Sequence, residues 1–370
     1  MEEINESLYD RILDFDSTRK AEWMRNRKPY AVLFELTPRC NFGCIHCYLQ
    51  NNHNDKDVLS TEQIKDILDV LCEKGILFIT FTGGEILSRS DFCDIYLYAK
   101  KKGFFVELFT NGYLLSAEII KILQEYPPLL VSISLYGATD EIYHKVTGVQ
   151  GAFTKVIANC RKLVDAGIRI SLKSPILSIT EPEMEQMQKV AESLGQKIVF
   201  SFEIHGTING TNEPLDYRTS LKSMLEYEFK DYLSRISEAE VDKIEDNTRK
   251  LQNDPHIFNC NVAMNSFVID YNGNMLPCMK LRHKGVSLFE NQFDEIWENF
   301  KVYKEYLVSS ANICKKCDAI YFCDTCPAEK DFICGDYEKR DCNDCKAAKI
   351  RELFYKGKID YDEAIKMADL

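Results

Sequence analysis

An alternation of short apolar runs with longer amphipathic stretches, from Tyr30 to Glu203, constrains the fold of this chain most strongly. The apolar runs are rich in β-branched and aromatic residues and lie at 31–37, 77–82, 104–109, 129–135, 168–174 and 197–203. Helical periodicity predicts helices between them at 60–74, 91–101, 116–124, 152–166 and 183–194. This order is typical of βαβ units around a parallel sheet. Six units predict an α/β fold, a partial (β/α)6 TIM-like barrel, with ligands bound at the carboxyl ends of its strands.

The ends of the predicted helices carry suitable local chemistry. Ser60, with Gln63 three residues later, and Ser116, three residues before Ile119, are candidate N-caps. Four glycines stand where these helices should end, at Gly75, Gly103, Gly167 and Gly195. Local signals therefore agree with the periodicity.

The alternation stops after Gly210, and beyond it the composition of the chain changes at two points. Residues 221–252 predict charged helix, and a boundary is expected near Asp254 and Pro255. Beyond them the chain is dense in cysteine, with one hairpin-like stretch over 266–278. We predict an N-terminal extension at 1–29, the barrel at 30–210, a helical connector at 211–256 and a cysteine-rich domain at 257–370. The cysteine-rich domain has too few apolar residues to fold by burial of a hydrophobic core alone, so we expect metal clusters to stabilise it.

Composition narrows the classes of function. The formal net charge is −12, which argues against a nucleic-acid-binding surface, since such surfaces depend on clustered Lys and Arg. No apolar run approaches the length of a membrane span, and residues 1–20 are acidic and polar rather than signal-like. We therefore expect a cytoplasmic protein that binds neither nucleic acid nor membrane. Fifteen cysteines are not explained by disulfides in a reducing cytosol, and they predict metal binding.

Three of these cysteines, Cys40, Cys44 and Cys47, directly follow the first predicted strand. Iron-sulfur clusters are normally held by four thiolates, so a three-cysteine site would leave one iron open to another ligand. Zinc is the alternative, with His46 as a conceivable fourth ligand. Because His46 lies between two of the cysteines, its joining the same site would require strain, and packing beside a cluster suits it better.

The spacing C-x-x-x-C-x-x-C of this loop, after Leu36-Thr37-Pro38-Arg39, resembles the signature of the radical SAM superfamily. The resemblance covers nearly the whole chain. It implies that S-adenosylmethionine chelates the open iron, and that an electron from the cluster breaks the sulfonium bond to give methionine and a 5'-deoxyadenosyl radical.

Further positions resemble the places where this family contacts S-adenosylmethionine. Gly83, Gly84 and Glu85 follow the second predicted strand and resemble the G-G-E motif, which would contact the methionine ammonium group. By the same resemblance Ser134 would hold the ribose and Lys173 the carboxylate, and Asn111 would lie at the cofactor site. No catalytic acid or base is assigned.

Nine downstream cysteines resemble the SPASM extension of radical SAM enzymes, which holds two auxiliary four-iron clusters, although only two residues precede Cys326 where the common pattern has three. The resemblance implies an outer cluster on Cys314, Cys317, Cys323 and Cys345. It implies an inner cluster on Cys260, Cys278 and Cys326. Either Cys342, which we favour, or Cys334 completes the inner cluster, or an open iron remains for a substrate thiolate. A zinc ribbon would also suit the C-x-x-C pairs.

The resemblance implies three 4Fe-4S clusters, S-adenosylmethionine, and an enzyme acting on a ribosomally made precursor peptide. The expected outcome is a thioether, ether or carbon-carbon crosslink. The alternatives are oxidation of a Ser or Cys, as by sulfatase maturases, a small-molecule substrate, or a non-enzymatic zinc scaffold. We expect flavodoxin or ferredoxin as electron donor. About thirty residues precede the first strand, so a separate small protein is expected to recognise the peptide.

Overall fold

The computed structural model describes residues 22–49, 56–232, 238–340 and 342–369. The chain divides into two compact units, each made from two separate stretches of sequence. The first unit comprises Met1–Arg218 and Asn261–Phe300, and the second comprises Thr219–Cys260 and Lys301–Leu370. Among the described residues, none of the helices combines the length and the apolar character that crossing a bilayer requires.

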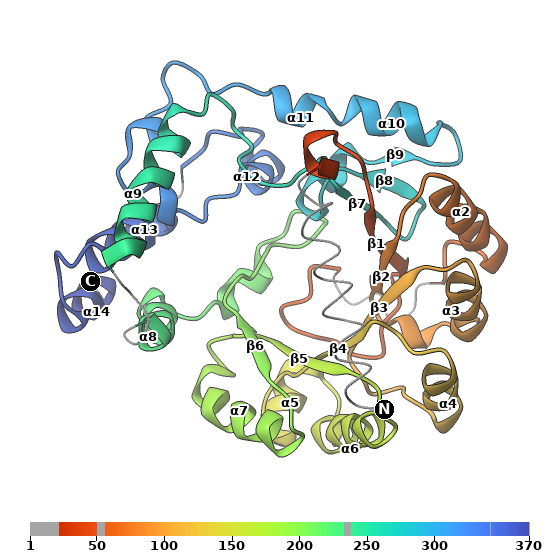
Figure 1. Ribbon diagram of the computed structural model, residues 1–370. Helices are drawn as coiled ribbons and strands as arrows, with labels where there is room; N and C mark the ends of the chain where they lie inside the picture. Colours follow the sequence, from red (N-terminus) through yellow and green to blue (C-terminus); the bar gives the residue numbers. More distant parts are fainter. Residues whose placement is uncertain (1–21, 50–55, 233–237, 341, 370) are drawn as a thin grey trace. The chain divides into compact units, whose positions relative to one another are not determined.

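The first unit contains a nine-stranded sheet in the order β6-β5-β4-β3-β2-β1-β7-β8-β9. Its first six strands run parallel, as the alternating pattern predicts. They are β1 (Ala31–Thr37), β2 (Phe78–Gly83), β3 (Phe105–Thr110), β4 (Leu130–Ser134), β5 (Ile170–Pro175) and β6 (Ile198–Ser201). Each begins within two residues of the predicted run. Figure 1 shows the helices of this unit on one side of these strands.

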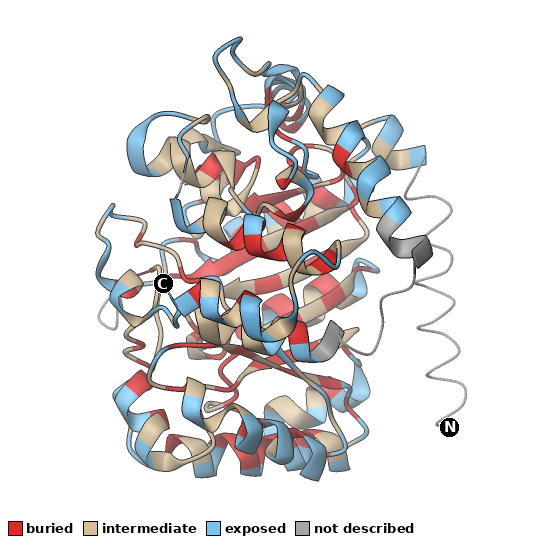
Figure 2. Ribbon diagram, turned by 90° about the vertical axis from the view of Figure 1, so that its left-hand side faces the viewer, coloured by how far each residue is buried: buried red, intermediate tan, exposed pale blue. Residues whose placement is uncertain are grey.

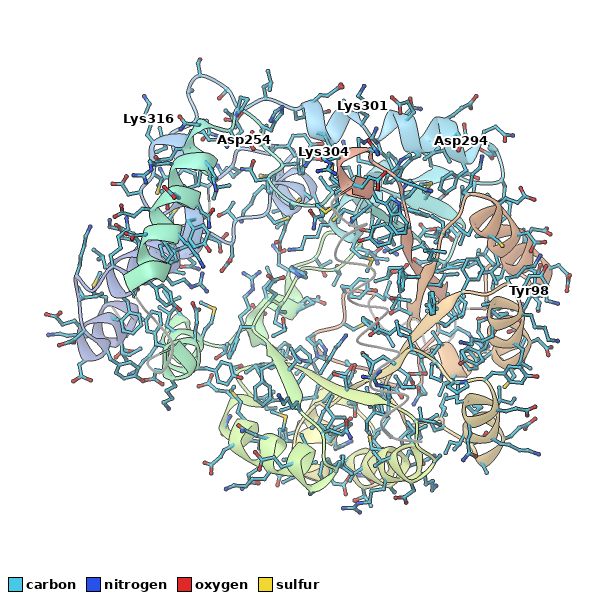
Figure 3. All side chains as sticks on the ribbon, viewed as in Figure 1. Tyr98, Asp254, Asp294, Lys301, Lys304 and Lys316 are labelled. Atoms are coloured by element: carbon cyan, nitrogen blue, oxygen red, sulfur yellow. The ribbon has the colours of Figure 1, made fainter. Side chains whose placement is uncertain are left out.

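The helices between the strands bury one face against the sheet, as their periodicity requires (Figure 2). They are α2 (Thr61–Glu73), α3 (Phe92–Lys101), α4 (Ala117–Glu125), α5 (Asp140–Thr147), α6 (Ala152–Asp165) and α7 (Met184–Ser193). Helix α5 was not predicted. Between α2 and α3, the hydroxyl of Tyr98 (Figure 3) donates to Asp69 Oδ1 at 2.8 Å, and Lys102 Nζ lies 2.6 Å from the same oxygen.

The predicted N-caps are confirmed. Ser60 accepts from the amide of Gln63, whose side chain accepts from the Ser60 amide, and Ser116 accepts from the amide of Ile119. The four glycines predicted at helix ends all have positive φ, at Gly75, Gly103, Gly167 and Gly195.

The capping box makes a local prediction. Replacing Ser60 with Ala leaves the Gln63 amide without its side-chain acceptor. We expect a loss of about 1 kcal/mol in the free energy of unfolding. Urea denaturation followed by circular dichroism measures it, and an unchanged midpoint would contradict the capping assignment.

The predicted hairpin is present but belongs to the main sheet. Strands β7 (Ser266–Ile269) and β8 (Asn274–Leu276) are antiparallel, and β8 also pairs with β9 (Val286–Ser287). Strand β7 pairs in parallel with β1, with Val32 opposite Phe267. A stretch of the cysteine-rich region therefore extends the sheet on the far side of β1. The 3-10 helix η4 (Met279–Lys284) and helix α10 (Phe293–Asn299) complete this part.

The second unit is mainly helical. The charged stretch predicted as helix forms α8 (Leu221–Tyr232) and α9 (Glu238–Asn253). The unit continues with α11 (Val302–Glu305), the 3-10 helices η5 (Cys314–Lys316) and η6 (Ile320–Phe322), and α12 (Pro327–Cys334), α13 (Cys342–Tyr355) and α14 (Tyr361–Asp369). Its core includes Leu225 and Phe229 of α8 packed with Ile350 and Tyr355 of α13.

Candidate functional site

The first cysteine group lies in a loop at the carboxyl end of β1, as predicted. Cys44 is buried, and Cys40 and Cys47 are half-buried. The loop docks on the last turn of α5: the amide of Gly43 donates to Thr147 O at 2.7 Å, and that of Ile45 donates to Val146 O at 3.0 Å. The unpredicted helix α5 thus supports the loop.

The three thiols lie close enough to influence one another's ionisation. Burial, then Glu85, then Cys47 raise the pKa of Cys40, to about 12. Burial, followed by Cys47 and Cys40, raises the pKa of Cys44 well above its usual value. Three thiolates gathered in a buried place need a compensating positive charge, and coordination to iron would supply it because a coordinating thiol is deprotonated outright.

The arrangement suits a cluster better than a single ion. Within the described ranges, no three His, Cys, Asp or Glu side chains converge to hold one metal ion. Zinc would bond every ligand at about 2.0–2.3 Å, whereas the thiolates of a four-iron cluster each bond a different iron. His46 packs at 5.2 Å from the Tyr136 ring, and burial lowers its pKa to about 4. Nδ1 of His46 and Nδ2 of Asn41 are buried without a hydrogen-bond partner, so this loop retains polar capacity for a bound group.

The glycine pair after β2 packs directly against the cysteine loop. The amide of Gly84 donates to Thr37 O at 2.8 Å, and the amide of Glu85 donates to Arg39 O at 2.7 Å. A Cβ on Gly83 would overlap Thr37 O, and one on Gly84 would overlap Arg39 O. The close approach that requires glycine here is therefore between two loops of the chain, whereas the sequence suggested an approach to a ligand.

Glu85 is fully buried, and its carboxylate connects its own loop to the end of β3. Its carboxylate accepts from the amide of Leu87 at 3.0 Å, from the Thr110 hydroxyl at 2.6 Å and from the Asn111 amide at 2.6 Å. Burial raises the pKa of Glu85, against the opposing effect of these three hydrogen bonds. The Asn111 side chain donates to Asn41 Oδ1 at 2.9 Å and lies 3.8 Å from Cys40 Sγ. The structure thus brings Glu85, Asn111 and the cysteine loop together.

Ser134 and Lys173 are register partners on β4 and β5. Lys173 Nζ lies 3.6 Å from Glu107 Oε1 on β3 and 4.0 Å from the centre of the Phe109 ring. Glu107 also accepts from the Ser132 hydroxyl at 2.8 Å. The partner of Lys173 was missed because its segment lies two strands away and carries no motif.

A buried arginine, Arg89, contacts the end of the strand that leads into the cysteine loop. The sequence analysis did not identify this residue. Arg89 donates to the carbonyls of Leu36 and Leu59, both at 3.1 Å, and forms two hydrogen bonds with Asp91. Asp57 lies 3.7 Å from Arg89 and accepts from the Thr37 hydroxyl at 2.6 Å. No spacing signal marks these residues in the sequence.

The four cysteines predicted for the outer cluster all belong to the second unit. The pKa of Cys314 is raised by burial first, then by Cys323 and Cys345, with a further contribution from Cys317. Two short 3-10 helices, η5 and η6, each end at a cysteine, Cys317 and Cys323, and Cys345 lies on α13. Arg340 donates to Cys345 Sγ at 3.7 Å and so places a positive charge beside the group.

The cysteines predicted for the inner cluster come from both units. Cys278 belongs to the first unit, and Cys260 and Cys326 belong to the second. The carbonyl of Cys260 accepts from Lys304 Nζ (Figure 3) at 2.9 Å. Cys342 opens α13, three residues before Cys345, and is exposed, as is Cys334 at the end of α12.

Comparisons with known proteins agree with these features. A model of the radical SAM superfamily matches residues 34–194, and a model of the SPASM iron-sulfur cluster-binding domain matches residues 260–327. These two domains imply 4Fe-4S clusters and S-adenosylmethionine as cofactors.

Three relatives are informative. The antilisterial bacteriocin subtilosin biosynthesis protein AlbA of Bacillus subtilis is 28% identical, over 88% of this chain and 72% of its own length. The AdoMet-dependent heme synthase of Methanosarcina barkeri is 26% identical, over 84% of this chain and 94% of its own length. The structure of Streptococcus suis SuiB bound to precursor peptide SuiA superposes with a TM-score of 0.65 at 14% identity, covering 85% of this chain and 75% of SuiB. The chain is therefore an enzyme of the radical SAM superfamily that carries a SPASM domain and is related to peptide maturases.

Proposed function

We propose that this enzyme modifies a ribosomally made precursor peptide and introduces a thioether, ether or carbon-carbon crosslink. The observation that carries the proposal is the largely buried three-cysteine loop, which Asn111 contacts and Glu85 adjoins, in a chain similar along most of its length to a bacteriocin biosynthesis protein. When bound, the cluster and S-adenosylmethionine supply a 5'-deoxyadenosyl radical that abstracts hydrogen from the peptide.

The residues of the first unit bind and orient the cofactors in this proposal. Cys40, Cys44 and Cys47 hold a cluster with one open iron. Gly83 and Gly84 allow the second loop to lie against the cysteine loop, and this places Glu85 beside it. On the neighbouring strands, Ser134 binds the ribose and Lys173 the carboxylate of S-adenosylmethionine. Glu107 holds the Lys173 ammonium in place until that carboxylate arrives.

A first experiment separates radical chemistry from a zinc scaffold. The protein is reconstituted anaerobically, and iron, sulfide and 5'-deoxyadenosine are measured for the wild type and for a variant with Cys40, Cys44 and Cys47 changed to Ala. With three four-iron clusters we expect about twelve irons and reductant-dependent cleavage, falling to about eight irons and no cleavage in the variant. Zinc without deoxyadenosine would contradict the proposal.

The SPASM cysteines are assigned to two clusters. We propose an outer cluster on Cys314, Cys317, Cys323 and Cys345, and an inner cluster on Cys260, Cys278 and Cys326 with Cys342 as fourth ligand. The barrel at 30–210 then generates the radical, and the region at 257–370 holds both auxiliary clusters. Complete clusters would relay electrons from the oxidised peptide, whereas an open inner iron could bind a substrate thiolate.

The choice of the fourth ligand makes a testable prediction. We expect Cys342→Ala to alter the electron paramagnetic resonance signal of the inner cluster and to lower the iron content. Cys334→Ala is the matched control, since Cys334 is also exposed and its thiol donates to Lys330 O at 3.0 Å. The reverse pattern would assign the ligand to Cys334, and two silent variants would indicate an open iron.

A second candidate function is a reaction on a small molecule. The similarity to a heme synthase, which extends over 94% of that protein, favours it. Oxidation of a single Ser or Cys, as in sulfatase maturation, is a further outcome within the peptide class. Coexpression with short peptides encoded beside the gene, followed by mass spectrometry, distinguishes these possibilities. A crosslink removes two hydrogen atoms and joins two residues, so fragment ions from the segment between them are absent. Oxidation of one Ser to an aldehyde removes the same two atoms but leaves fragmentation along the whole peptide intact. Peptides left unmodified by a cluster-loaded enzyme that cleaves S-adenosylmethionine would favour the small-molecule reaction.

A radical SAM enzyme also needs an external electron for each cleavage. We propose flavodoxin or ferredoxin as the donor. Deoxyadenosine formation with either reduced carrier in place of dithionite tests this requirement.

A further inference from the structure

A buried acidic side chain lies on the strand that leads into the cysteine loop. Glu35 of β1 is fully buried, and its carboxylate forms a two-point ion pair with Arg282, at 2.9 Å from Nη1 to Oε1 and 2.5 Å from Nη2 to Oε2. The hydroxyl of Tyr48 donates to Oε1 of Glu35 at 3.0 Å. The Arg282 guanidinium also lies over the rings of Tyr48 and Tyr271, at 5.9 and 5.7 Å from their centres.

The two partners of Glu35 come from the two segments of the first unit that carry predicted cluster ligands. Tyr48 is the residue after Cys47. Arg282 lies in η4, which begins directly after Cys278, and it is 247 residues from Glu35 in sequence. The start of η4 is tied to that cysteine, since the Lys280 amide donates to Cys278 Sγ at 3.4 Å and the Leu281 amide donates to Cys278 O at 3.0 Å. The buried carboxylate therefore connects the loop of Cys47 to the segment of Cys278.

A second, weaker contact joins η4 to the segment after β6, at the opposite edge of the parallel strands. Lys280 Nζ lies 3.8 Å from the carboxylate of Glu203, which follows β6. Glu203 is two-thirds exposed, so this pair contributes little to stability. The Glu35–Arg282 pair is different, because burial removes most of the screening between its charges and leaves either charge costly without the other.

Stability alone does not account for such a pair. A buried ion pair is often no more stabilising than apolar side chains of similar volume, because desolvation offsets the Coulombic attraction. It does impose a defined geometry, since the planar guanidinium binds a carboxylate at two points. It also leaves one fixed negative and one fixed positive charge in a region of low dielectric.

We propose that Glu35, Tyr48 and Arg282 are positioning residues that couple the first cluster's loop to the Cys278 segment and balance the charge between the two cluster sites. The inference rests on the proposed function only in assigning clusters to Cys47 and Cys278. The bidentate pair fixes η4, and hence Cys278, against β1. Because the pair is neutral as a whole, neither cluster experiences an uncompensated charge from it.

The proposal predicts shifts of opposite sign in the cluster reduction potentials. Glu35→Gln removes the paired carboxylate and leaves Asp270 as an acidic group that acts on the guanidinium, so the surroundings become more positive, reduction becomes easier and the potentials rise. Arg282→Gln leaves the carboxylate uncompensated, so the potentials fall. The double variant is neutral again, and its potentials return toward those of the wild type. Redox titration of the reconstituted holoenzyme, followed by electron paramagnetic resonance, measures them, and the first cluster is recognised by the change in its signal when S-adenosylmethionine binds.

A matched control exists in the same unit. Asp69 also pairs with a cation, Lys102, and accepts from a tyrosine hydroxyl, that of Tyr98, but it joins the outer helices α2 and α3. Asp69→Asn should leave the potentials unchanged. Tyr48→Phe and Arg282→Lys preserve the charges, so they should keep the potentials near those of the wild type while accelerating amide hydrogen exchange in η4. These two conservative variants keep the proposal testable if Glu35→Gln fails to fold.

Each outcome decides one question. Shifts of the same sign in Glu35→Gln and Arg282→Gln, or no shift in fully loaded variants, would overturn the charge-balancing role. Unchanged exchange in η4 in both conservative variants would overturn the positioning role. A wild type that binds no iron would instead contradict the proposed function and would be recognised before any variant is compared.

Discussion

Gly84→Ala is expected to displace the cysteine loop and to abolish loading of the first cluster. A Cβ at this position would overlap the carbonyl oxygen of Arg39, and it would also lie 2.6 Å from Pro38 O. Both contacts are backbone atoms, so no side chain can rotate away to relieve them. The overlap affects the peptide that leads directly into Cys40. We expect a loss of about 3 kcal/mol or more in the free energy of unfolding, at the upper end of the usual cost of overpacking.

The matched control is Gly75→Ala. Gly75 has a φ of +75°, but a Cβ there would meet nothing within 4 Å. Its replacement should cost only the left-handed backbone penalty of about 1–2 kcal/mol and leave the iron content intact. Urea denaturation and iron analysis of both variants provide the comparison. If Gly84→Ala loaded its first cluster as fully as Gly75→Ala does, the tight packing of the two loops would not be required for cluster binding.

The elements that the sequence predicts well are those with local signals. Strand β1 was predicted with its observed bounds, and Ser60 forms the expected capping box. Helix α5 was missed because only Tyr143, Val146 and Thr147 are buried along its eight residues, too few for a clear apolar period. Its ends did carry signals, since Thr139 caps it and Gly148 closes it in a left-handed conformation.

The sequence did not predict which segments that are distant in the chain lie side by side in the fold. The hairpin of β7 and β8 follows from its turn, but its alignment beside β1 depends on contacts such as Ala31 opposite Ser266. Nothing local to residues 266–276 specifies that partner. The same limit applies to Glu35 and Arg282, which are individually unremarkable charges in sequence and form a buried pair only after the sheet has assembled.

The candidate site also has some features that the sequence predicts and others that it does not. The cysteine spacing predicts that Cys40, Cys44 and Cys47 share one loop, and in the structure all three lie in the loop that follows β1. Their role as cluster ligands stays a prediction. The requirement for glycine at positions 83 and 84 could not be understood from sequence, because the atoms that they accommodate belong to residues 37–39. The contacts of Ser134, Lys173 and Glu85 with S-adenosylmethionine remain predictions.

Replacing Glu85 with Gln is expected to have the second large effect. The carboxylate accepts hydrogen bonds at both oxygens: from the Leu87 amide and the Thr110 hydroxyl at Oε1, and from the Asn111 amide at Oε2. A glutamine has only one acceptor oxygen, so its NH2 group would face at least one backbone amide donor. A buried donor without an acceptor costs about 1–3 kcal/mol, and the opposed donors add to this. We therefore expect a loss of roughly 2–4 kcal/mol in stability.

Glu85→Gln should also weaken binding of S-adenosylmethionine by more than its loss of stability would explain. Either the Leu87 amide or the Asn111 amide would lose its acceptor, and the Asn111 side chain contacts Asn41 and Cys40 in the cysteine loop. Thr110→Val is the comparison variant, because the carboxylate keeps both amide bonds while one donor to Glu85 and the acceptor of the Gly112 amide are removed. If Glu85 organises the loop, Glu85→Gln should weaken S-adenosylmethionine binding, measured by calorimetry on the cluster-loaded protein, far more than Thr110→Val. If both variants hold the same amount of iron and bind S-adenosylmethionine equally weakly, the loss of affinity would be assigned to the hydrogen bond of the Thr110 hydroxyl. The contact between the Glu85 carboxylate and the Asn111 amide would then not be needed for cofactor binding.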